Sequence, residues 1–92
     1  MNVLFTVEAK GRAAKFIESL DPKKKERIRE IIIMLKGNPV PVGQADIAKL
    51  KGYESMAGIR IGDLRMVYEV FWNHGRILLH YVGPRAKAYD NI

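Results

Sequence analysis

The chain has 92 residues, enough for one domain with a modest apolar core, and residues 1–92 are expected to form a single domain. It contains no cysteine, so disulfides and thiolate metal sites are excluded. Its net charge of +6 and pI near 9.8 fit a nucleic acid or an acidic protein as partner. Apolar runs such as residues 31–35 are short, so neither a signal peptide nor a membrane span is expected, and a cytoplasmic location is the default.

The N-terminal half is predicted to form a strand and two helices. Residues 2–7 are apolar and β-prone, as in an opening strand. Apolar residues at helical spacing predict a helix over residues 8–20. Asp21 as N-cap and Pro22 as first helical residue begin a second helix, which Gly37 ends. So short a connection predicts that the two helices pack as an antiparallel hairpin.

The C-terminal half is predicted to be mostly strands. Residues 38–55 form a loop-rich segment, since two prolines and two glycines interrupt it, and Ile47 and Leu50 are its expected contacts with the core. Beyond this segment, apolar and polar residues alternate, which predicts strands that turn at residues 62–63 and 73–75.

The last predicted strand runs from Arg76 to about Val82, where Gly83 and Pro84 are expected to stop it. The predicted order is therefore β-α-α-β-β-β. This is an α+β fold in which a helical hairpin packs on one face of a small, largely antiparallel sheet. The other sheet face is left free to bind a ligand.

Two arginines are predicted to lie on that uncovered face. If Ile59 and Ile61 face the helices, Arg60 must face away. On the next strand, the more uniformly apolar set is Met66, Tyr68 and Val70, which would face the helices. Arg65 lies at the other set of alternating positions, so it is expected to face away too. Like charges this close repel unless something negative lies between them.

That negative group could be a ligand or one of the chain's own carboxylates. Asp63 and Glu69 are near enough in sequence for ordinary surface ion pairs, which contribute little to stability. Further along, Tyr89 lies four positions after Arg85, so the two share a face if this tail is helical. Such a pair could clamp a phosphate and stack on a base, or the tyrosine could simply dock on the core.

A basic cluster marks the start of the second predicted helix. Five of seven residues there are basic: Lys23, Lys24, Lys25, Arg27 and Arg29. Cations at a helix N-terminus oppose its dipole, which favours a role in contacting phosphates, although Glu26 and Glu30 could make it an ordinary solvated face. The two histidines, His74 in a turn and His80 in the last strand, form no metal or nuclease motif, so no cofactor or metal is expected.

Three segments in this order resemble the RelE/ParE toxin superfamily. Residues 49–52, KLKG, are similar to its K-L-x-G element. Residues 59–70, IRIGDLRMVYEV, resemble its central hairpin. The closing run at residues 82–89, VGPRAKAY, is similar to its G-x-R…Y ending. The resemblance covers essentially the whole chain, and the predicted order of elements agrees with it.

The resemblance implies a toxin of a type II toxin–antitoxin system that cleaves mRNA in the ribosomal A site, by attack of a ribose 2′-hydroxyl on the adjacent phosphate. Arg65 would bind the scissile phosphate, Arg85 would stabilise its developing charge, and Tyr89 would stack on a base or transfer a proton. RNA binding is expected from Arg60, Lys49, Lys51, Lys87, Lys23, Lys24, Lys25 and Arg27. The implied partners are an acidic RelB-like antitoxin, the ribosome and mRNA, with operator DNA reached only through the antitoxin.

Gly58, Leu64 and Pro84 depart from the ribonuclease pattern, which often has a basic residue, an aromatic residue, and a histidine or lysine at these places. Arginine is a poor proton acceptor, so the general base is unassigned, with the lysines at 49, 51 and 87 as candidates. Two alternatives remain: a ParE-like inhibitor of DNA gyrase, and a non-catalytic member that acts as co-repressor with its antitoxin.

Overall fold

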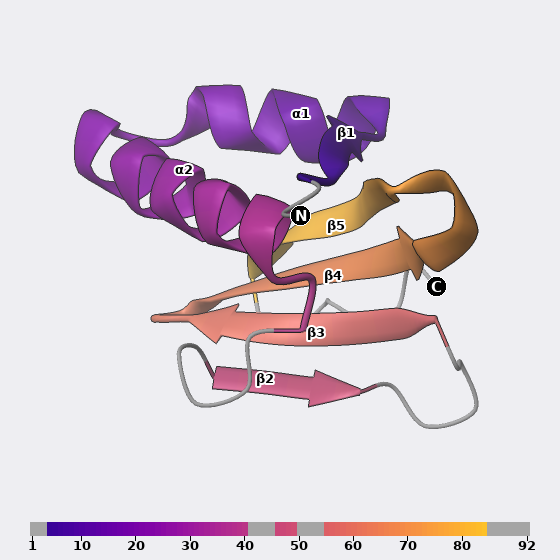
Figure 1. Ribbon diagram of the computed structural model, residues 1–92. Coiled ribbons are helices and arrows are strands. Elements are labelled where there is room, and N and C mark those ends of the chain that lie inside the picture. Colours follow the sequence, from indigo (N-terminus) through magenta and orange to yellow (C-terminus); the bar gives the residue numbers. More distant parts are fainter. Residues whose placement is uncertain (1–3, 41–45, 50–54, 85–92) are drawn as a thin grey trace.

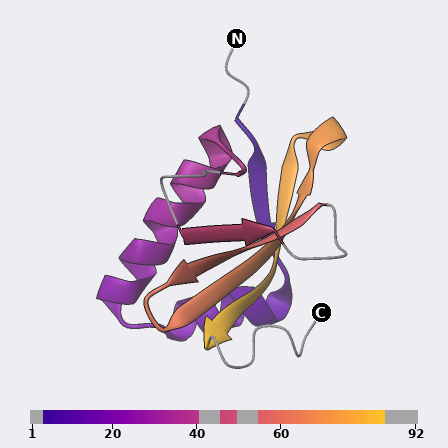
Figure 2. The same cartoon turned by 90° about the horizontal axis from the view of Figure 1, so that it is seen from below.

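The computed structural model describes residues 4–40, 46–49 and 55–84. Its elements are β1 (Thr6–Ala9), α1 (Gly11–Ser19), α2 (Pro22–Gly37), β2 (Asp46–Lys49), β3 (Met56–Ile61), β4 (Leu64–Phe71), the 3-10 turn η1 (Trp72–His74) and β5 (Arg76–Pro84). Both helices lie on one side of a sheet with the strand order β1-β5-β4-β3-β2, in which β1 and β5 are parallel and the other pairs antiparallel (Figure 1). The predicted α+β architecture is confirmed. Seen from below, the strands fan out with a pronounced twist (Figure 2).

The second predicted helix is confirmed, together with the reason that it starts where it does. The Asp21 side chain accepts a hydrogen bond of 2.9 Å from the backbone N–H of Lys24, and Pro22 is the first helical residue. The first helix is shorter than predicted at both ends. Glu8 and Ala9 belong to β1, because they pair with Leu78 and Leu79 of β5.

The prediction of a loop throughout residues 38–55 is wrong for residues 46–49, which form the edge strand β2 against β3. The sheet therefore has one strand more than expected, and the order is β-α-α-β-β-β-β. Ile47 packs against the core as predicted. Leu50 lies outside the described residues, as do residues 2 and 3 of the predicted opening strand. Its residues 4 and 5 are described but are not strand, and β1 begins at Thr6.

The last strand continues through Pro84 and does not stop near Val82. Pro84 pairs with Leu64 of β4, whereas β1 accompanies β5 only as far as Leu79. The proline thus occupies the final position of a strand that has one paired side at this end within the described chain, where a missing N–H is tolerated.

A β-bulge interrupts the pairing of β4 with β5. Val67 pairs with Tyr81 while Tyr68 pairs with Leu79, so His80 is an extra residue on β5. Because side chains alternate along a strand, this extra residue reverses the faces that the last residues of β5 occupy. Val82 becomes a core residue as a result.

The core lies between the helices and the sheet. Its fully buried large side chains on this side include Tyr68, Ile28, Leu35, Ile59, Met66, Ile77 and Leu79. Tyr68 is the one with a polar group, and its hydroxyl donates a 2.7 Å hydrogen bond to the Pro39 carbonyl. Burial raises the pKa of Tyr68, because the ionised phenol would lose its hydration. This bond also ties the segment after α2 to the sheet.

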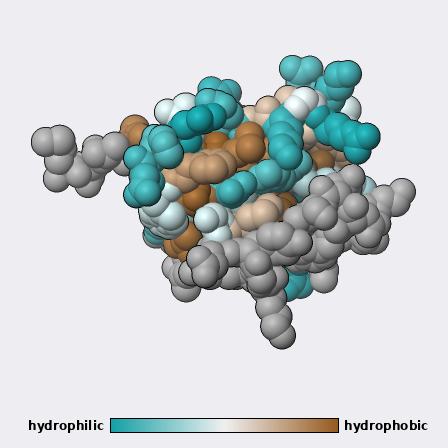
Figure 3. All heavy atoms as spheres, turned by 90° about the vertical axis from the view of Figure 1, so that its right-hand side faces the viewer, coloured by the Kyte–Doolittle hydropathy of each residue, from teal (hydrophilic) through white to brown (hydrophobic). Residues whose placement is uncertain are grey.

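At the end of the molecule that carries the turn between β4 and β5, hydrophobic atoms are exposed among hydrophilic ones (Figure 3). Trp72 of this turn is 57% exposed, and its ring meets Phe5 edge-on with centroids 5.7 Å apart. Phe5 is itself held by a hydrogen bond from its backbone N–H to the carbonyl of Lys36. The turn, β1 and the end of α2 are thereby joined.

No helix in the described ranges is long and apolar enough to cross a bilayer.

Candidate functional site

The face of the sheet opposite the helices, here called the open face, carries the two arginines predicted to lie there. Arg60 of β3 and Arg65 of β4 are Cα partners across the Gly62–Asp63 turn. Arg60 is exposed and Arg65 is partly buried, while Ile59, Ile61 and Met66 are packed in the core. The predicted placement of both arginines is confirmed, and the strand register makes them direct neighbours on one face of the hairpin.

Gly58 has a structural role beside Arg65. A Cβ atom at Gly58 would lie 3.0 Å from Nη1 of Arg65 and 3.4 Å from its Cδ. The arginine side chain therefore extends from β4 across β3 and lies over the glycine, with its Nε buried. A basic side chain at this position, common in the ribonuclease pattern, would compete with Arg65 for the same space. The absence of a side chain at Gly58 thus leaves room for Arg65 to lie across β3.

Tyr81 belongs to the open face, although the alternation of residues in the sequence gives no sign of it. The bulge at His80 places it opposite Val67, and it packs against Met56 and Val67. Its ring lies over Gly83, where a Cβ would come within 2.6 Å of the phenolic oxygen. Gly83 is the Cα partner of Arg65, so the tyrosine ring lies on the strand next to that arginine.

Glu69 and His80 form a partly buried pair near the bulge. Nε2 of His80 lies 2.8 Å from Oε1 of Glu69, and the two side chains are only 18% and 28% exposed. The sequence offers Glu69 as a partner for the open-face arginines, whereas its hydrogen bond in the structure is with His80. His74 lies in the turn before β5, as predicted, and is exposed.

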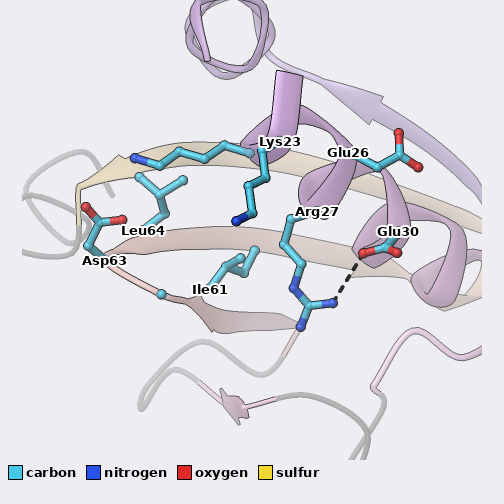
Figure 4. Close-up of a pocket in the computed structure, with 9 residues that line it drawn as sticks. Lys23, Glu26, Arg27, Glu30, Ile61, Asp63 and Leu64 are labelled. Atoms are coloured by element: carbon cyan, nitrogen blue, oxygen red, sulfur yellow. Dashed lines mark ion pairs between the residues drawn. The ribbon is translucent and has the colours of Figure 1, made fainter. Parts of the chain in front are cut away.

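A groove of about 760 Å³ lies on the helix side of the same hairpin (Figure 4). Ile61 and Leu64 lie at its base, and α2 forms its other wall (Figure 4). Its cations are Lys23, Lys24 and Arg27, and its carboxylates are Glu26, Glu30 and Asp63. The opposite charges offset one another, and Arg27 forms an ion pair of 3.6 Å with Glu30. The groove is thus apolar at its base and close to neutral at its rim.

The basic cluster of α2 is divided between two surfaces. Lys23, Lys24 and Arg27 line the groove, whereas Lys25 and Arg29 line a separate hollow between α1 and α2. Neither surface is the open face. The structure therefore does not bring the cluster together with Arg60 and Arg65, and any RNA that contacts both must pass around the hairpin turn.

Sequence reasoning missed a hollow of about 400 Å³ beside the end of β5. Lys10 and Arg12, at the start of α1, line it together with residues 80–84 of β5, and no carboxylate is among its described lining residues. It adds positive charge next to the strand end from which the chain continues to Arg85. Lys10 and Arg12 are far from residues 80–84 in the sequence, and only the packing of α1 against β5 brings them together.

The remaining predicted site residues cannot be placed. Arg85, Lys87, Tyr89 and Lys51 lie outside the described residues, and Lys49 is described only as a backbone position in β2. Within the described ranges, no three His, Asp or Glu side chains gather closely enough to hold a metal ion.

Comparisons with known proteins point in one direction. No protein-family model matches the chain. The protein named "Putative toxin RelE1" from Methanocaldococcus jannaschii is 36% identical over 87 residues, which cover 95% of this chain and 97% of the relative. The fold is similar to that in the archaeal RelE–RelB complex from Pyrococcus horikoshii OT3, with a TM-score of 0.82, 29% identity, and coverage of 92% of this chain and 99% of that one. The RelB–RelE antitoxin–toxin complex from Methanococcus jannaschii gives a TM-score of 0.71 at 26% identity, covering 89% of this chain and 94% of that one.

Proposed function

This chain belongs to the RelE family of toxins, and we propose that it acts as a one-domain, ribosome-dependent endoribonuclease that cleaves mRNA in the A site. The observation that carries the proposal is the pairing of Arg60 with Arg65 on the open face. Two guanidinium groups on a rigid hairpin provide several donors in a fixed geometry, which suits a phosphate. The strand next to Arg65 leads directly to Arg85.

The proposed reaction uses the RNA's own nucleophile. The 2′-oxygen of a ribose forms a bond to the adjacent phosphorus, the bond from phosphorus to the 5′-oxygen breaks, and a 2′,3′-cyclic phosphate and a 5′-hydroxyl result. The 2′-hydroxyl loses its proton to a general base, and the leaving 5′-oxygen gains one. Arg65 orients the phosphate and Arg85 stabilises the charge that develops on its oxygens. Tyr89 stacks on a base or takes part in proton transfer.

The remaining cations serve binding. Lys49, Lys51 and Lys87 are proposed to hold the RNA strand, and one of these lysines to act as the base. The groove cations of α2 (Lys23, Lys24 and Arg27) and its neighbour Lys25 would contact ribosomal RNA, a contribution that weakens as salt rises. The near-neutral rim of the groove supports a smaller share for α2 than its sequence implies.

An acidic RelB-like antitoxin is the proposed inhibitor, because the related RelE proteins of Pyrococcus horikoshii and Methanococcus jannaschii form complexes with RelB. We propose that a segment of the antitoxin folds on binding and either covers the open-face arginines or displaces the residues around Tyr89. Operator DNA would be reached only through the antitoxin. Hydrogen exchange with and without the antitoxin would test this, since no protection at Arg60, Arg65 or residues 85–89 contradicts it.

The decisive experiment is mRNA cleavage on purified, programmed ribosomes by the wild type and by Arg85→Ala. We expect site-specific cleavage by the wild type and a loss of about 10²-fold or more in the variant, since an arginine that stabilises a transition state contributes this much. Arg76→Ala is the matched control, because Arg76 lies at the opposite end of β5 in an exposed ion pair with Glu8. Its cleavage should equal that of the wild type.

Other outcomes would favour the two alternatives. Gyrase-dependent DNA breaks without mRNA cleavage would identify a ParE-like inhibitor. Absence of both activities, with operator binding in the presence of antitoxin, would identify a non-catalytic co-repressor. Either result refutes the ribonuclease proposal.

A further inference from the structure

We infer that Tyr81 is a positioning residue that fixes the peptide group from which Arg85 extends. The inference rests on the proposed function for its consequence in catalysis, although the anchoring itself does not. It starts from the bulge, because His80 is the residue that turns Tyr81 out of the core and onto the open face. A regular strand would have placed Tyr81 on the same side as Leu79.

The tyrosine hydroxyl holds one particular carbonyl. It donates a hydrogen bond of 2.9 Å to the oxygen of Pro84, the last residue of β5. The carbonyl of Pro84 and the N–H of Arg85 belong to the same peptide group. Since a peptide group is planar, restraining its oxygen also restrains the N–H on its other side.

Neighbouring residues restrict the conformations that the Tyr81 ring can take. The Tyr81 side chain packs against Met56 and Val67, and its ring extends over Gly83 toward Pro84. A Cβ at Gly83 would lie 2.6 Å from the phenolic oxygen and 2.8 Å from Cζ, so the tyrosine can take this pose only over a glycine. The glycine, the bulge and the hydroxyl therefore act together as one anchor.

The anchor connects the strand of Arg65 to the end of β5. Gly83 is the Cα partner of Arg65, and the carbonyl that Tyr81 holds is that of the next residue, Pro84. The advantage of such an anchor is in orientation, because a displacement of about 1 Å in a reacting group can lower a rate by 10²-fold.

Tyr81→Phe is the test, since it removes the hydroxyl and keeps the ring. The chain offers a matched control in Tyr68→Phe, which removes a bond of the same chemistry, from a tyrosine hydroxyl to the Pro39 carbonyl at 2.7 Å, on the core side of the sheet. The first readout is the backbone order parameter and hydrogen exchange of the Arg85 amide by NMR. We expect the amide to become more mobile and to exchange faster in Tyr81→Phe, whereas Tyr68→Phe lowers the melting temperature without this change.

The second readout is cleavage on programmed ribosomes. For Tyr81→Phe we expect kcat to fall roughly tenfold, with KM within about twofold of the wild type, because the contacts that bind RNA remain. Gly83→Ala should reproduce both effects with the hydroxyl still present, since the added Cβ displaces the ring.

An Arg85 amide that behaves alike in the wild type and Tyr81→Phe overturns the inference, and so does an equal loss of kcat in Tyr68→Phe. A wild type that does not cleave refutes the proposed function alone, because the NMR comparison still decides whether Tyr81 anchors this peptide group.

Discussion

The two faces of the sheet are packed in different ways. On the face that the helices cover, large apolar side chains such as Met66 and Leu79 fill all the space and are fully buried. On the open face, glycines at 58 and 83 leave space that the side chains of Arg65 and Tyr81 occupy. The covered face holds the main core, whereas the open face, on which Val67 is also fully buried, holds two polar side chains.

Two tyrosines show the difference on a small scale. Each donates a hydrogen bond to a proline carbonyl, Tyr68 at 2.7 Å to Pro39 and Tyr81 at 2.9 Å to Pro84. The first bond is buried and ties the segment after α2 to the sheet, while the second is exposed and lies at the strand end beside the proposed site. The same chemistry therefore occurs in the core on one face and beside the proposed site on the other.

The largest expected effect is on the covered face. Met66→Ala removes most of a fully buried side chain, so we expect the free energy of unfolding to fall by about 2–5 kcal/mol in urea denaturation. Cleavage per folded molecule should stay near the wild-type value. A loss of stability below about 1 kcal/mol would mean that this face does not carry the core.

Arg65→Ala on the open face should have the reverse effect to Met66→Ala: it should lower cleavage and leave stability nearly unchanged. We expect cleavage on ribosomes to fall by about 10²-fold, which corresponds to roughly 2.7 kcal/mol of transition-state stabilisation. The free energy of unfolding should change by less than about 1 kcal/mol, since Arg65 is only partly buried. Arg76→Ala carries the same loss of charge at the far end of β5 and should leave cleavage unchanged.

A smaller effect is expected from Gly58→Ala. The new Cβ would lie 3.0 Å from Nη1 of Arg65, closer than ordinary contact, so the guanidinium must move. We expect cleavage to fall by about tenfold with little change in melting temperature. Gly37→Ala is the control, because nothing lies within 4 Å of its added Cβ. Equal cleavage by the two variants would show that the pose of Arg65 over Gly58 is unimportant.

The pH dependence of stability should report on the buried Tyr68. Its folded pKa is raised by burial, so its contribution to stability is complete below the ordinary tyrosine value near 10 and is lost as pH rises above it. The difference in unfolding free energy between the wild type and Tyr68→Phe should shrink by about 1.4 kcal/mol for each pH unit above 10. A constant difference up to pH 11 would contradict the buried, neutral phenol.

Local signals predicted most of the fold. The cap at Asp21, the helical spacing of apolar residues and the alternation in β3 and β4 each depend on neighbours in sequence, and each was confirmed. β2 could not be found in this way, since residues 46–49 become a strand only by pairing with β3. Glu8 and Ala9 likewise belong to β1 because of distant β5 residues.

The same limit applies to the candidate site. Alternation placed Arg60 and Arg65 correctly, because β3 and β4 pair without interruption at these residues. It could not place Tyr81, since strict alternation assigns this residue to the same face as Ile77 and Leu79, and only the bulge at His80 reverses it. A hydrogen-bond register that shifts by one residue leaves no clear mark in a single sequence.

The first and last strands of this fold are neighbours: Thr6 of β1 pairs with Arg76 of β5, 70 positions further along the chain. Closing so long a loop is entropically costly and is among the slower events in folding. During synthesis, β1 and the two helices leave the ribosome early but cannot complete their sheet until β5 has followed them. A protein proposed to cut mRNA on the ribosome would thus gain its folded sheet only after the ribosome that makes it has read most of its message.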